Sequence, residues 1–111
     1  MLPKSKRLNL SKDFRFVAAG VKVSTANFRV MYRFSGEAEP LVGVALSKQN
    51  FKRAVDRNRA KRLSFEVLGK IYPSLKDGLN LVIMPKAQIF SSDIEELTKE
   101  LKKINDIYKA D

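Results

Sequence analysis

Residues 52–66 have the sequence KRAVDRNRAKRLSFE, in which six positions are Lys or Arg and the only acids are Asp56 and Glu66. The following residues extend an apolar pattern as far as Pro73, which predicts a helix over about 55–72. At about 100° per residue, one narrow sector of this helix is apolar, and we expect it to face the core: Ala60, Leu63, Val67 and Ile71. The helix is therefore predicted to have one buried stripe and one cationic stripe.

The cationic stripe is a candidate binding surface. Like charges four residues apart on a helix repel each other mildly, and a bound polyanion would offset this repulsion. Arginine suits paired contacts to phosphate oxygens, and asparagine adds a donor and an acceptor. An ordinary solvated helix face is the alternative interpretation. Together with the cations just before the helix, the residues predicted to bind nucleic acid are Lys48, Lys52, Arg53, Arg57, Asn58, Arg59, Lys61 and Arg62.

Phe65 is predicted to project near the centre of the cationic stripe. Two interpretations of this aromatic side chain are open. The preferred one is packing against a neighbouring loop or terminal segment. The other is a platform for base stacking, a contact that contributes about 1–3 kcal/mol per base.

Composition narrows the classes of function. The 111 residues are long enough for one domain, predicted to span 1–111, and 22 basic against 12 acidic residues give a net charge of +10. Such an excess favours a polyanionic partner, with nucleic acid ahead of an anionic membrane. The chain has no Cys and no His, so it lacks thiolate metal ligands, cysteine nucleophiles and the usual general base near neutral pH. A self-contained hydrolase would need carboxylates or Lys in their place.

The same sequence indicates where the protein works. No run of about 18 apolar residues is present, so no membrane-spanning helix is predicted. The N-terminal residues MLPKSKRLNLSKDF are basic but lack the apolar stretch of a secretory signal. A cytoplasmic location is therefore expected.

The remaining elements follow from periodicity and capping signals. Ser11 is the expected N-cap of a short helix over about 11–19. Strands are expected at 27–34, 41–47 and 79–85. A last helix is expected in the C-terminal segment that follows these strands.

That last helix is expected to open with a capping box between Ser92 and Glu95. Its apolar stripe is Ile94, Leu97, Leu101, Ile104 and Tyr108. The predicted order is α-β-β-α-β-α, which indicates a single-domain α+β sandwich.

The strand at 27–34 alternates between apolar and basic side chains. Its apolar face should meet the core, and the opposite face carries Arg29, Met31 and Arg33. This second face could hold a single nucleic-acid strand, or it could be an ordinary solvent face.

These residues resemble the protein subunit of bacterial ribonuclease P. The resemblance is centred on AVDRNRAKRL (54–63), preceded by GVALSK (43–48) and by KSKRLNLSKDF (4–14), and LNLVIMPKA (79–87) follows. It spans nearly the whole chain. It implies a fold like domain 2 of ribosomal protein S5, with a left-handed β-α-β crossover through the charged helix.

The resemblance also implies partners and chemistry. The partner would be a large catalytic RNA that, with Mg²⁺ held mainly by the RNA, removes the 5′ leader from precursor tRNA. The chain would thus be the protein subunit of an endoribonuclease whose catalytic centre lies in the RNA, with no catalytic and no metal-binding residue in this chain. Phe14 matches the aromatic residue of the first helix that lines the cleft for the leader, and the face with Arg29, Met31 and Arg33 corresponds to the sheet side of that cleft. A second aromatic of the family falls on Ala18 here, so Phe16 is the candidate replacement.

Other classes of function remain as alternatives. A ribosomal or RNA-assembly protein could use the same basic face without any role in cleavage. DNA binding is disfavoured because no helix precedes the charged helix by a short turn. Binding to a membrane surface is disfavoured because the face opposite the cations is needed for the core.

Overall fold

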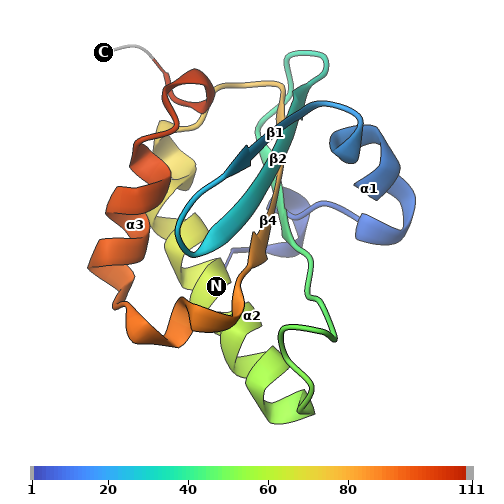
Figure 1. Cartoon of the computed structure of the whole chain (residues 1–111). Helices are drawn as coiled ribbons and strands as arrows, with labels where there is room; N and C mark the ends of the chain where they lie inside the picture. Colours follow the sequence, from blue (N-terminus) through green and yellow to red (C-terminus); the bar gives the residue numbers. More distant parts are fainter. Residues whose placement is uncertain (1, 110–111) are drawn as a thin grey trace.

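The chain forms a four-stranded sheet with two helices on one side and a third helix on the other (Figure 1). The computed structural model describes residues 2–109. Short 3-10 turns join several of the main elements. These elements are α1 (Leu10–Ala18), β1 (Val21–Ser24), β2 (Phe28–Phe34), β3 (Leu41–Val44), α2 (Ala54–Ile71), β4 (Leu79–Pro85) and α3 (Ile94–Lys102).

The sheet has the strand order β1-β2-β4-β3. Strand β2 pairs antiparallel with β1 and with β4, whereas β3 pairs parallel with β4. Helix α2 connects these two parallel strands, so β3, α2 and β4 form a β-α-β crossover. The α+β class is confirmed, but the predicted order lacked β1, whose four residues are mostly exposed.

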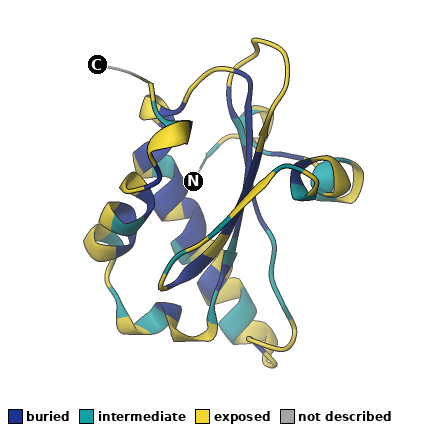
Figure 2. Ribbon diagram, turned by 45° about the horizontal axis from the view of Figure 1, so that its top comes forward, coloured by how far each residue is buried: buried dark blue, intermediate teal, exposed yellow. Residues whose placement is uncertain are grey.

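The central strand β4 is buried along nearly its whole length because both faces of the sheet are covered. The larger core lies between the sheet and the helices α2 and α3, and Leu81 and Ile83 belong to it. The smaller core lies under α1, where Val82 meets Val17 and Met31. Figure 2 shows the buried central strands between the helical layers.

The helix ends differ from the sequence predictions by small shifts. Asn9, not Ser11, is the N-cap of α1, and the Ser11 hydroxyl donates to Oδ1 of Asn9 at 2.7 Å. The capping box of α3 joins Asp93 to Glu96 rather than Ser92 to Glu95. Asp93 is also an effective cap, and its carboxylate favours the positive end of the helix.

The end of α3 was also predicted too late. The helix ends at Lys102, so Ile104 and Tyr108 lie beyond it, although Ile104 is buried. Helix α2 ends where expected, since a 3-10 turn containing Pro73 follows it. The predicted strands are observed, with β3 shorter than the apolar run that indicated it.

Glu100 of α3 holds the turn between β1 and β2 against the larger core. Its carboxylate accepts hydrogen bonds from the backbone N–H of Asn27 at 2.7 Å and from the side-chain amide of Asn27 at 2.8 Å. The hydroxyl of Thr25 donates to the same carboxylate. This cluster fixes the start of β2 relative to α3.

Candidate nucleic-acid interface

The residues predicted to bind nucleic acid lie in the first half of α2 and in the loop before it, and we call this set the α2 face. All of its side chains are exposed except Arg57, which is half-buried. The α2 face comprises Lys48, Lys52, Arg53, Arg57, Asn58, Arg59, Lys61 and Arg62.

Arg57 is partly committed to the fold. Its Nη1 donates to the carbonyl oxygens of Phe51 and Lys52, at 2.9 Å and 3.1 Å. These carbonyls belong to the loop that enters α2, whose N-cap residue Arg53 makes no side-chain capping hydrogen bond. Arg57 therefore braces this loop and retains only part of its guanidinium for a ligand.

Arg59 is oriented by an aromatic side chain. Its Cζ lies 4.4 Å from the ring centroid of Phe90, and the Phe90 ring packs edge-on against Phe51. A cation over an aromatic face is favoured by about 0.5–1 kcal/mol at exposed sites. The guanidinium is thus held in place, and its edges remain available for phosphate oxygens.

Phe65 is buried, although its position on the helical wheel suggested the exposed cationic stripe. It is only 5% exposed and belongs to the larger core, so its prediction as the centre of the cationic stripe is wrong. The N-terminal segment covers it, and Cζ of Arg7 lies 5.8 Å from its ring centroid. Packing against a terminal segment is therefore confirmed as the role of Phe65, and this buried ring offers no platform for a base.

The second predicted surface lies on the side of the sheet that α1 covers. Met31 is 7% exposed and lies in the smaller core, and Phe14 packs against that core. The two side chains are therefore brought together as a largely buried floor rather than an open face.

Three of the predicted cleft residues remain accessible. Phe16 is 37% exposed, and Cζ of Arg33 lies 4.2 Å from its ring centroid. Nη1 of Arg33 also donates to the carbonyl of Phe16 at 3.3 Å, so α1 and β2 are joined here. Arg29 is exposed at the other end of the strand and borders a hollow of about 370 Å³.

This hollow includes residues that sequence reasoning missed. Lys22 of β1 and Met84 of β4 line it together with Arg29 and Met31. Lys22 faces Met31 across the β1–β2 pairing. The sequence signal for Lys22 was the short alternation VKVS (21–24), which is too brief to indicate a strand by itself.

Within residues 2–109, no three His, Cys, Asp or Glu side chains are grouped as a metal site would require. No helix in the same range is long and apolar enough to cross a membrane. The surfaces described above carry cations and aromatic rings, which suit binding.

The family model described as Ribonuclease P matches residues 2–109. The chain belongs to this family. A ribonuclease P protein component from Nitrosococcus oceani is 40% identical over 78 residues, which cover 69% of this chain and 65% of that protein. One from Pseudanabaena sp. is 32% identical over 106 residues, which cover 94% of this chain and 91% of the relative.

Solved structures support the same fold. The ribonuclease P protein of Staphylococcus aureus superposes with a TM-score of 0.76 at 19% identity, covering 96% of this chain and 100% of that one. The Thermotoga maritima protein gives 0.76 at 21% identity, with 88% and 93% covered. Some curated ribonuclease P relatives are matched over less than two thirds of their length, as with 59% of the Pseudoalteromonas translucida protein.

Proposed function

We propose that this chain is the protein subunit of a ribonuclease P ribonucleoprotein, which removes the 5′ leader from precursor tRNA. The observation that carries the proposal is the family match over residues 2–109 together with the exposed basic side chains of the α2 face. In this proposal the chain binds a catalytic RNA and the leader, and the RNA supplies the catalytic centre.

The α2 face is the proposed contact to the catalytic RNA. Its exposed Arg and Lys side chains would neutralise phosphates and release counterions, so affinity would fall steeply with salt. Arg59 is held by Phe90, so its side chain loses less conformational entropy when it contacts a phosphate. Arg62 and Lys61 are also exposed on the same helix.

The leader is proposed to run along the α1 side of the sheet. Phe16 and Arg33 would meet it as a pre-stacked ring and cation, and Arg29 would meet it at the neighbouring hollow. Phe14 and Met31 would support this surface from below, because they are packed into the smaller core. This division revises the predicted cleft, in which all five side chains faced the leader.

Phosphodiester hydrolysis is assigned to the RNA and Mg²⁺. A bound Mg²⁺ stabilises developing charge on the phosphate and can activate water. The described side chains form no cluster that would hold a metal ion, so the proposal places Mg²⁺ on the RNA. We propose a cytoplasmic location and expect neither DNA nor membrane partners.

Reconstitution tests this function. The purified chain is combined with the ribonuclease P RNA from the same genome, and cleavage of precursor tRNA is measured across Mg²⁺ concentrations at moderate salt. The chain alone should not cleave, and the protein should lower the Mg²⁺ concentration that the RNA requires. If added protein leaves cleavage at low Mg²⁺ unchanged, the proposal is rejected.

A second measurement separates this function from a general role in RNA assembly. The reconstituted complex should bind precursor tRNA more tightly than mature tRNA, because only the precursor has a leader. Arg29→Ala and Arg33→Ala should reduce this difference, whereas Lys102→Ala on α3 should leave it intact. Equal affinities for precursor and mature tRNA would favour the assembly role.

A further inference from the structure

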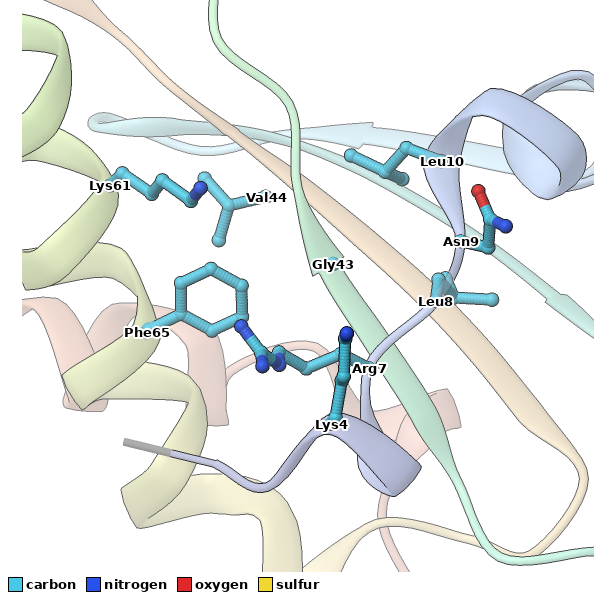
Figure 3. A pocket seen from close by; sticks show the side chains of 9 residues that line it. All are labelled: Lys4, Arg7, Leu8, Asn9, Leu10, Gly43, Val44, Lys61 and Phe65. Atoms are coloured by element: carbon cyan, nitrogen blue, oxygen red, sulfur yellow. The ribbon is translucent and has the colours of Figure 1, made fainter.

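A basic hollow of about 430 Å³ lies where the N-terminal segment, the outer edge of β3 and α2 meet. We call it the edge hollow. In Figure 3, Arg7 reaches from the N-terminal segment to the Phe65 ring of α2, Lys4 extends from the same segment beside Arg7, and Lys61 reaches from α2 toward Val44 of β3. Its lining residues are Lys4, Arg7, Leu8, Asn9, Leu10, Gly43, Val44, Lys61 and Phe65.

The charges around the edge hollow are all of one sign. Among the described residues that line it there is no carboxylate, and three are cations: Lys4, Arg7 and Lys61. Nε of Arg7 is buried and has no hydrogen-bond partner among the described residues. A buried N–H without a partner is normally costly, so the Arg7 side chain would gain from a small movement that brought this donor to an acceptor in the hollow.

The floor of the edge hollow adds a backbone donor. The N–H of Ala45 donates to Ile83 of β4 at 3.0 Å, whereas the carbonyl of Val42 accepts from Leu8 of the N-terminal segment at 2.8 Å. Successive N–H groups of a strand point alternately to its two sides. The N–H of Val44 therefore points away from β4 and toward the edge hollow.

We propose that the edge hollow binds one phosphate group of the RNA backbone. This inference rests on the proposed RNA-binding function and deepens it, because it adds Lys4 and Arg7 to the interface and assigns Lys61 to a specific contact. A phosphate is negatively charged and has several acceptor oxygens, so it matches three cations and a backbone N–H. The buried ring of Phe65 supports Arg7 from one side and limits its conformations.

The salt dependence of RNA binding tests the proposal. Affinity for the ribonuclease P RNA is measured between 0.1 M and 0.5 M monovalent salt for wild type, Arg7→Gln, Lys61→Gln and the control Lys102→Gln. Loss of one phosphate contact makes the slope of log K against log salt shallower by about 0.9. For affinities that are equal at 1 M salt, this change corresponds to about an eightfold loss of affinity at 0.1 M. We expect this change for Arg7→Gln and Lys61→Gln, and a near wild-type slope for Lys102→Gln.

The outcomes separate this inference from the proposed function. A wild-type chain that neither binds the RNA nor supports cleavage refutes the function. A wild-type chain that does both, with the slopes of Arg7→Gln and Lys61→Gln equal to that of Lys102→Gln, refutes only the edge hollow. If Arg7→Gln proves unfolded by circular dichroism, the exposed pair Lys4→Gln and Lys61→Gln decides instead, with a slope loss of about 1.8 expected.

Inorganic phosphate distinguishes a backbone phosphate from a free ion. Amide NMR signals of Arg7, Leu8 and Val44 should shift when phosphate replaces chloride at constant ionic strength, and Lys61→Gln should weaken the shift. If phosphate shifts these signals while the RNA slopes stay unchanged, the hollow binds a free ion and the RNA proposal fails.

Discussion

Replacing Phe65 by alanine should destabilise the protein rather than selectively weaken RNA binding. The ring is 5% exposed within the larger core, so truncation removes nearly all of its buried area and leaves a cavity. Such substitutions cost about 3–5 kcal/mol. At an unfolding entropy of about 2.1 cal/mol/K per residue, this loss lowers the Tm of the 111-residue chain by about 13–21 °C. The loss is a large fraction of a typical total stability of about 5–15 kcal/mol.

Urea unfolding followed by circular dichroism measures this loss, and Phe65→Leu is the matched variant. Leucine keeps most of the buried area, so its cost should be about 1 kcal/mol, and the folded variant should bind RNA as wild type does. If Phe65 were a stacking platform, Phe65→Leu would instead lower RNA affinity while leaving stability near that of wild type, because leucine cannot stack. If Phe65→Ala costs less than 1 kcal/mol, or if Phe65→Leu lowers RNA affinity tenfold without loss of stability, the assignment of Phe65 to the core is wrong.

Three further substitutions or titrations test other parts of the structure. Arg57→Ala should cost about 1–3 kcal/mol in urea unfolding because two loop carbonyls lose their donor, whereas exposed Arg62→Ala should stay within about 0.5 kcal/mol. Glu100→Ala should cost about 1–3 kcal/mol in thermal unfolding, because buried Asn27 loses its acceptor. Burial raises the pKa of Tyr108 from 10.0 to about 12, so the unfolding midpoint should fall as pH rises from 10 to 12, and the phenolate absorbance of this ring should appear near pH 12.

Helix α2 and strand β4 could be predicted from the sequence because each has a local signal. The apolar positions of α2 recur at helical spacing, and the run LNLVIMP indicates a strand buried on both faces. The exposure of seven of the eight predicted residues of the α2 face also followed from helical geometry. These predictions needed no knowledge of which segments pack together.

Other features depend on contacts between distant segments, and the sequence did not reveal them. Strand β1 has four mostly exposed residues and gains its pairing from β2. Phe65 is buried because residues of the N-terminal segment lie over it, and Met31 is buried because α1 covers the sheet there. A helical wheel or a strand alternation assigns faces but does not show what will cover them.

Helix α2 separates the residues that pack into the core from the exposed cations along its length as well as around its axis. In the half with residues 54–62, only Ala60 is buried, whereas the half with residues 63–71 buries Ser64, Phe65, Val67, Leu68 and Ile71. The second half anchors the helix, so cations in the first half can remain exposed without disturbing the core. The first half also contains the N-terminus, whose backbone N–H groups carry a partial positive charge. Side chains and backbone are therefore positive at the same end, an arrangement that weakens the helix and that a bound polyanion would offset, which supports the α2 face as the contact to RNA.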